Sequence, residues 1–394
     1  NMWYNGCYTM TSFIQGNEKV FTKNPLYWDK EAKLFDTVTI KMVESNDVAF
    51  QLYQSGEIDE VLLTESNLKT ITDSESNPFH DERVERRPDR YSYQFHFNYA
   101  KNKEDGTPDT NWNTAIANKN LRLAWYYGLD LSEYYKRTNA INPLKCENNF
   151  YSMKGFLYTS DGRDYTELVR ERLGLGEYNG TTMVRLDKEK AEAYQKQAVE
   201  ELTAKGVTFP VVLDHYVAAS NQTALDDANV LKQAFINSFG ADFVQVNIRT
   251  YVSSFVKEVR TPRLHSVSIN GWGADYGDPQ NYLGQEMYGV DNAAYSTVHS
   301  YINDATNEEL LSDYKTYTEM VNAADAINGD LDKRYEAYAD AEAFMIQNAL
   351  VVPCYYNIRW GLSHINFYSI MNSMYGLQSN KYKNWETSKT AYTT

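Results

Sequence analysis

The chain has 394 residues, of which 42% are hydrophobic and 23% charged, a composition typical of a globular protein with room for two lobes. Its 53 Asp and Glu residues outnumber its 38 Lys and Arg residues, and the net charge of −15 argues against nucleic acid and anionic membranes as direct partners. The acidic excess weakly favours cationic or zwitterionic ligands. No apolar run approaches the ~18 residues that a membrane-spanning helix requires.

The first third of the chain combines predicted strands with two helices. Side chains alternate between apolar and polar over residues 37–43 and 91–98, the period of a strand with one buried face. Ser45 and Gly56 occupy the positions of an N-cap and a C-terminal glycine around one helix. The other expected elements are a strand at residues 19–22, a polar loop at 98–113 and a helix at 118–128.

From about residue 140 the pattern changes to helices that alternate with strands. This alternation predicts an α/β lobe. Helices are expected from Asp187 to about residue 205 and at residues 225–239, 253–259 and 331–345, and strands at residues 208–215, 244–248, 265–270 and 350–356.

The residues that most often carry chemistry form no known catalytic motif. The six histidines are scattered, and none stands at metal-ligand spacing, so we interpret them as structural. Three cysteines, Cys7, Cys146 and Cys354, lack the CxxC spacing of a zinc or redox site. Neither a GxSxG elbow nor a Walker A loop is present. One acidic loop is the remaining candidate for chemistry.

This loop follows the strand predicted at residues 265–270 and reads "GWGADYGDPQ" over residues 271–280. Asp275 and Asp278 could form a general acid–base pair, although such carboxylates usually come from separate strands. With Asn281 they could also begin a calcium loop, although they supply few oxygen ligands. The Asp278-Pro279 pair is equally typical of a surface turn. The residues of the loop alone leave these alternatives open.

Six segments, spread in order from residue 5 to residue 356, resemble landmarks of one protein family. The family is that of the extracytoplasmic solute-binding proteins for oligopeptides, dipeptides and nickel, which serve ABC importers. The segments read "NGCYTMTSF" with "KNPLYWD", "AFQLYQSGEID", "NKNLRLAWYYGLD", "LDKEKAEAYQKQA", "GWGADYGDPQNYL" and "LVVPCYY". Family members carry a long segment before the first landmark, so the resemblance also suggests an N-terminally truncated chain.

The resemblance implies an α/β, two-lobed periplasmic-binding-protein-like (type II) fold with part of the first lobe missing. Residues 1–140 would be the remainder of lobe I, residues 141–354 lobe II, and residues 355–394 the return to lobe I. The implied protein is an extracytoplasmic monomer, periplasmic or a cell-surface lipoprotein, and not an enzyme. It would need no cofactor or metal, and it would capture oligopeptides between its lobes and deliver them to the permease subunits of an ABC importer.

The resemblance also assigns roles to individual residues of the acidic loop. Asp275 matches the aspartate that accepts the α-ammonium group of the ligand in peptide-binding relatives. Trp272 and Tyr276 would wall this carboxylate into a medium of reduced dielectric, where its bond to an ammonium group is strong. Gly273 would let the ligand approach the main chain. Asp278 would then belong to the turn.

Landmarks outside the acidic loop supply further candidate ligand-binding residues and some structural ones. Tyr355, Tyr356 and Arg359 match a region that lines the ligand cleft, and Arg359 could meet a ligand carboxylate. For these residues lobe packing or a plain surface charge is a competing interpretation. We expect Tyr27, Trp28 and Arg122 to be structural, the first two in a core.

Three alternatives remain open within the resemblance. The same fold could bind a non-peptide ligand such as a nickel chelate, haem or a sugar, or it could serve as a sensor or adhesion protein without transport. Cys146 and Cys354 lie near the expected crossings between lobes and could pair, or both could be free thiols. Gly273 stands where some relatives have a disulfide cysteine, so that bridge is not expected.

Overall fold

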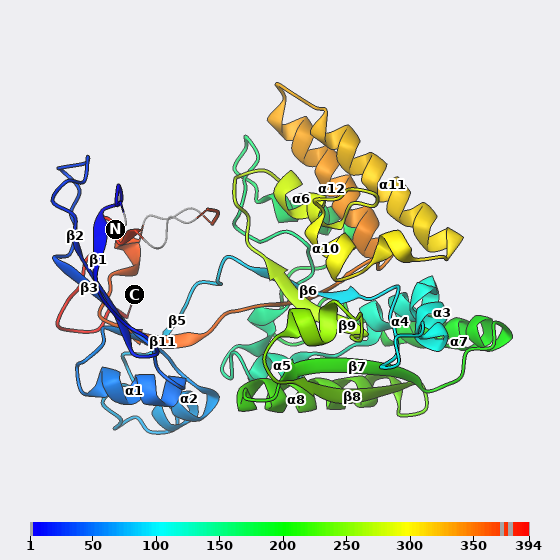
Figure 1. Ribbon diagram of the computed structural model, residues 1–394, viewed down its shortest axis with the longest axis horizontal. Helices are drawn as coiled ribbons and strands as arrows, with labels where there is room; N and C mark the ends of the chain where they lie inside the picture. Colours follow the sequence, from blue (N-terminus) through cyan, green and yellow to red (C-terminus); the bar gives the residue numbers. More distant parts are fainter. Residues whose placement is uncertain (1–2, 371–373, 377–380, 394) are drawn as a thin grey trace. The chain divides into compact units, whose positions relative to one another are not determined.

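The structure is a computed structural model that describes residues 3–370, 374–376 and 381–393 (Figure 1). Its internal contacts divide the chain into two compact units, each mixing helices with strands. Unit 1 is built from Asn1–Asp89, Thr138–Ala140 and Asn357–Thr394, and unit 2 from Arg90–Arg137 and Ile141–Tyr356. In the described part of the chain no helix combines the length and the apolar character needed to cross a membrane.

Unit 1 contains two three-stranded sheets, with strand orders β1-β2-β3 and β4-β11-β5. The Ser45 hydroxyl accepts a hydrogen bond from the Val48 amide and caps α1, as the sequence predicts. Trp28 is 77% exposed, so the expectation that it is a core residue is wrong for this unit. The elements are β1 (Tyr8–Ile14), β2 (Glu18–Lys23), β3 (Thr37–Lys41), α1 (Asn46–Gln54), β4 (Glu60–Leu62), α2 (Glu65–Thr72), β5 (Val84–Glu85) and β11 (Trp360–Ser363).

Unit 2 is larger and contains most of the helices. Its strands are β6 (Ser92–Phe97), β7 (Val211–Ala218), β8 (Val244–Tyr251), β9 (Val267–Trp272) and β10 (Val352–Tyr356). Its α-helices are α3 (Thr110–Ala117), α4 (Lys119–Gly128), α5 (Ser132–Lys136), α6 (Tyr165–Leu173), α7 (Lys188–Ala204), α8 (Gln222–Phe239), α9 (Gln280–Leu283), α10 (Ala294–Val298), α11 (Glu308–Asp325) and α12 (Leu331–Gln347). The short helix expected near residues 253–259 is a π-helical turn at Val256–Arg260.

Two sheets organise unit 2. One is antiparallel, with order β10-β6-β9, and the other is the parallel pair β7 and β8. Helix α8 packs along this pair, and α11 lies beside α12 (Figure 1). Leu231 and Phe235 of α8 are buried, as their helical spacing predicts.

The units depart from the expected lobe bounds at residues 90–137 and, by two residues, at 355–356. Residues 90–137 group with unit 2, because β6 pairs with β9 and β10, and α4 packs against α7. These pairings join segments far apart in sequence, which a reading along the chain does not detect. Arg122 is fully buried and donates to main-chain carbonyls that include those of Ile116 and Ala349, so it is structural as expected.

All three cysteines are buried, and none of them forms a disulfide. Cys146 and Cys354 both belong to unit 2, and the alternative that they pair is not realised. Burial raises the pKa of the Cys354 thiol, so this group remains protonated and unreactive at neutral pH.

Candidate functional site

The acidic loop leaves unit 2 at the end of an edge strand. In the sheet β10-β6-β9, strand β9 pairs only with β6 among the described strands. An edge strand presents a row of main-chain groups that another extended chain can pair with. The Tyr295 hydroxyl donates to the Gly271 carbonyl at 2.9 Å and holds the end of this strand.

Two glycines at this end make room for aromatic rings from the β6 side. A Cβ atom at Gly271 would lie 2.8 Å from the Tyr93 ring, and one at Gly273 would lie 2.9 Å from the Tyr91 ring. Both distances are too short for a real side chain. The rings therefore explain the glycines, including Gly273, for which the sequence suggested only the approach of a ligand.

Asn281 fixes the loop, although the sequence interpretation gave it no structural role. Its side-chain oxygen accepts hydrogen bonds from Trp272 Nε1 and from the Asp275 amide, both at 2.9 Å. The Trp272 ring also meets the Tyr295 ring edge-on, with centroids 5.9 Å apart. Asn281 lies at the start of a helix and is nearly buried, so its amide is committed to the loop rather than to a calcium ion. The position of Asn281, two residues after the Asp278-Pro279 turn, was the signal in the sequence that could have indicated this role.

The two carboxylates of the loop have different surroundings. Asp275 is exposed in unit 2, which corrects the expectation that Trp272 and Tyr276 bury it. Tyr276 is itself 49% exposed, and its hydroxyl contacts the Gln280 side chain. An exposed carboxylate in water forms weaker ionic contacts than a buried one. In this unit Asp275 is a free anion at the end of an edge strand.

Asp278 is instead engaged twice. One oxygen accepts from the Gln280 amide at 2.9 Å, which is the turn chemistry expected from the Asp-Pro pair. Both oxygens accept from Arg334 of α12, at 2.8 and 3.1 Å, and Arg334 also pairs with Asp325. Because Asp278 is occupied by this ion pair, the loop contains no acid–base pair of free carboxylates.

Tyr355 lies in the same cross-strand row as the first glycine of the loop. The register places Tyr355 of β10 opposite Tyr93 of β6, and Tyr93 opposite Gly271 of β9. The rings of Tyr355 and Tyr93 are stacked, with centroids 4.5 Å apart and planes within 3°. The structure therefore brings Tyr355 to the sheet face on which the loop begins.

Tyr356 and Arg359, which were expected with Tyr355 to line the ligand cleft, are placed differently. Tyr356 is 5% exposed, and its hydroxyl donates to the Ser152 carbonyl, so its side chain is part of the core of unit 2. This burial corrects the expectation that Tyr356 contacts a ligand, because successive strand residues point to opposite faces. Arg359 belongs to unit 1, is partly buried, and donates from Nε to the Asn357 side chain at 3.0 Å.

A cavity of about 370 Å³ lies beside β9 within unit 2. Its lining includes the carboxyl-terminal residues of the parallel strands β7 and β8, the end of a parallel sheet at which α/β proteins commonly bind ligands. Rings of several aromatic residues line it, as do His215 of β7 and Asp227 of α8. The aromatic lining residues are Tyr134, Tyr216, Tyr251, Phe255 and Tyr355. Alternation along the sequence did not reveal this cavity, because it is assembled from six separate segments.

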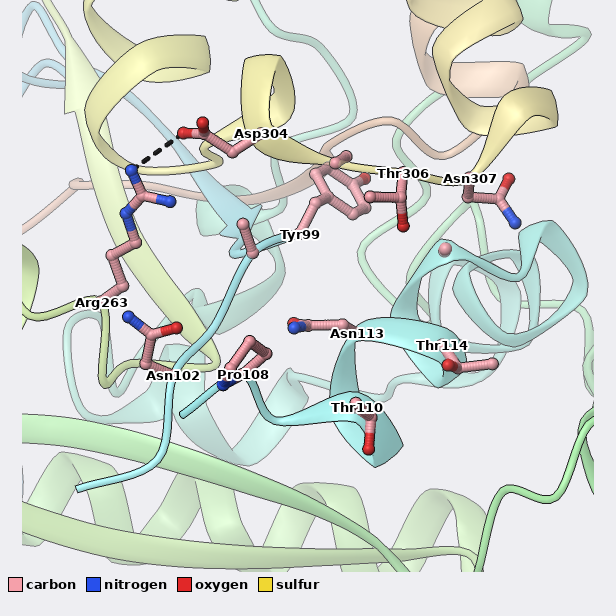
Figure 2. A pocket seen from close by; sticks show the side chains of 13 residues that line it. Tyr99, Asn102, Pro108, Thr110, Asn113, Thr114, Arg263, Asp304, Thr306 and Asn307 are labelled. Carbon is pink, nitrogen blue, oxygen red and sulfur yellow. Dashed lines mark ion pairs between the residues drawn. The ribbon is translucent and has the colours of Figure 1, made fainter. Parts of the chain in front are cut away.

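Figure 2 shows a second cavity of unit 2, of about 460 Å³. Arg263 and Asp304 form an ion pair of 2.9 Å at its side, and most of the other labelled polar side chains belong to Asn and Thr residues. The cavity includes Tyr99, just beyond β6, and so lies at the opposite end of the β6–β9 pair from Trp272. It shares none of the loop residues.

The face of the sheet opposite the Tyr93 and Tyr355 rings is a sealed polar layer. His96 Nδ1 lies 2.7 Å from Glu286 Oε1, and both side chains are fully buried. The Tyr151 hydroxyl donates to the same oxygen at 3.2 Å, and Ser268 of β9 contacts His299 at 3.0 Å. Within the described residues no group of three or more His, Cys, Asp or Glu side chains has the arrangement of a metal site.

An α/β chain in two compact units, with an edge strand, a free carboxylate and an aromatic cavity gathered in one of them, has the architecture of a solute-binding protein. Residues 1–293 match the profile of the bacterial extracellular solute-binding proteins, family 5 Middle. The match covers most of the chain, and the chain belongs to this family.

Known relatives agree with this assignment. The chain is 25% identical over 382 residues to the oligopeptide-binding protein AliB of Streptococcus pneumoniae and 27% identical over 376 residues to the oligopeptide-binding protein SarA of Streptococcus gordonii. These alignments cover 89% and 90% of the chain but 56% of each relative, so the chain spans about half the length of these proteins. Listeria monocytogenes OppA, solved bound to peptide, has the same fold, with a TM-score of 0.69, 18% identity, and coverage of 99% of this chain and 66% of that one.

Proposed function

We propose that this chain is the part of an extracytoplasmic solute-binding protein that captures oligopeptides for an ABC importer. The observation that carries the proposal is the edge strand β9, which leads directly into a free carboxylate at Asp275. A peptide in extended conformation can pair with such an edge through its main chain. The carboxylate then meets a positive charge at one end of the peptide.

The chemistry of the site favours binding over catalysis. Asp278 is held by Arg334, and the buried carboxylate Glu286 is held by His96 and Tyr151, so none of these groups is poised beside a free nucleophile. Main-chain pairing recognises the peptide backbone rather than its side chains. Such a mode permits many sequences, and we expect broad selectivity with one fixed end.

Asp275 indicates which end of the peptide is recognised. A carboxylate binds an ammonium group through a charge-assisted hydrogen bond, which is stronger than a neutral one. The free α-ammonium group of a peptide supplies that partner, whereas haem and most sugars do not. The relatives named as oligopeptide-binding proteins support the same ligand class.

Native mass spectrometry of the protein purified from its source tests the proposal. We expect a heterogeneous set of bound masses that fragment as peptides with free N-termini. A single non-peptide mass, such as a nickel chelate, would overturn the ligand class. Protein without any bound solute that also fails to bind peptides in calorimetry would contradict capture itself and favour a sensor or adhesion role.

A further inference from the structure

The aromatic cavity beside β9 contains no unpaired charge. Asp227 is the one carboxylate among its described lining residues, and it accepts from Arg137 Nε at 2.9 Å. A charged side chain that entered the cavity would lose hydration without gaining an opposite charge. The cavity therefore selects against Lys, Arg, Asp and Glu side chains, although the chain as a whole is acidic.

The residues that line the cavity suit an aromatic side chain. Tyr134, Tyr251, Phe255 and Tyr355 belong to four different elements or loops, and all four line the cavity. Aromatic side chains prefer edge-to-face or offset contacts with other rings, and each buries roughly 150–250 Å² of surface. A volume of about 370 Å³ is sufficient for such a side chain.

His215 adds one uncharged hydrogen-bonding group to the lining. Burial lowers the pKa of its imidazole to about 4, so the ring is neutral at physiological pH. Its Nδ1 atom is shielded and has no hydrogen-bond partner among the described residues. The other ring nitrogen, Nε2, is then the atom that can meet a ligand. The accessible nitrogen of a neutral imidazole can donate to or accept from a hydroxyl group.

We propose that this cavity holds one uncharged aromatic side chain of the bound peptide and favours tyrosine, whose hydroxyl reaches His215. This specificity rests on the proposed capture of peptides along β9, and it adds a side-chain preference to recognition that otherwise depends on main chain. The cavity is lined by residues 267–270 of β9, so a peptide paired with that strand passes its mouth.

Calorimetry with a set of alanine pentapeptides tests the proposal on the native protein that carries these residues. In each peptide one alanine is replaced by Phe, Tyr, Lys or Glu, at each position in turn. We expect one position at which Phe binds about tenfold more tightly than Ala, as the burial of an aromatic side chain predicts. At that position Tyr should exceed Phe by about threefold, and Lys and Glu should bind more weakly than Ala.

Two variants locate the effect. Ala224→Trp, on a lining residue of α8, fills the cavity and should abolish the aromatic preference without weakening the all-alanine peptide. The matched control Thr223→Trp, on an exposed neighbour outside the lining, should retain the preference. His215→Phe should keep the preference for rings but remove the difference between Tyr and Phe.

The outcomes separate the specificity from the underlying function. If the native protein binds no peptide of the set, both the proposed function and this inference fail. If it binds the all-alanine peptide but shows no aromatic preference, or keeps that preference in Ala224→Trp, the inference alone is overturned. If His215→Phe still distinguishes Tyr from Phe, the assigned hydrogen bond is wrong.

Discussion

The two faces of the sheet β10-β6-β9 have opposite chemistry. One face carries the stacked rings of Tyr93 and Tyr355 and opens onto a cavity. The other buries His96 against Glu286, with Tyr151 on the same carboxylate. Both faces come from the same alternating strands. This unit therefore buries charged groups on the face that stabilises its structure. On the other face it presents uncharged rings to a ligand, with one exposed carboxylate at the end of the strand.

Loss of a carboxylate from the sealed face should have the largest effect. Glu286→Leu leaves His96 Nδ1 and the Tyr151 hydroxyl without their buried partner. We expect the free energy of unfolding to fall by about 3–5 kcal/mol, measured by urea titration. Glu286→Gln keeps an acceptor oxygen and should cost less. A Leu variant as stable as the wild type would show that the sealed layer contributes no stability.

A buried histidine next to β9 should also make stability depend on pH. Burial lowers the pKa of His265, which precedes β9, to about 4, whereas an unfolded imidazole titrates near 6.5. Between these values the unfolded state binds more protons, so stability is full above about pH 6.5 and declines as the pH falls toward 4. The difference between the two pKa values corresponds to about 3 kcal/mol in the free energy of unfolding. Urea titrations across this range should show a smaller decline in His265→Phe, and an unchanged decline would assign the effect to other groups.

Crowding on the aromatic face should have a moderate effect. In Gly271→Ala the new Cβ atom lies 2.8 Å from the Tyr93 ring, which is stacked on Tyr355 and must shift. We expect a loss of about 1–3 kcal/mol in the free energy of unfolding. Gly176→Ala has open space around its Cβ atom and should stay within about 0.5 kcal/mol of the wild type. Equal stability of the two variants would contradict the tight fit of the rings.

The smallest effect should come from the free carboxylate. Because Asp275 is exposed, Asp275→Asn should leave stability unchanged but weaken a peptide with a free N-terminus about tenfold, or about 1.4 kcal/mol. N-acetylation of the peptide should weaken wild-type binding equally and have no further effect on the variant. Asp291→Asn, at another exposed position of unit 2, controls for net charge. Calorimetry that finds full affinity in Asp275→Asn would reject the ammonium role.

Several elements were predictable because their determinants are local. Ser45 caps α1, and alternation marks β6 within one residue of its ends at Ser92–Phe97. Helix α8 begins three residues before its expected start, at Gln222, because Asn221 supplies the cap. Helix α11 was not among the predicted elements, although its buried residues recur at helical spacing: Leu310, Tyr314, Tyr317, Val321 and Ala324.

The sequence by itself determined the class of fold, the family landmarks and the position of the acidic loop, because periodicity and motif order are properties of neighbouring residues. Only the tertiary structure decided which carboxylate is free. Arg334 lies 56 residues from Asp278 along the chain and pairs with it, while Asp275 has no ion-pair partner among the described residues and remains exposed. Likewise, Tyr355 lines a cavity and Tyr356 does not, because strand pairing sets which face each side chain occupies.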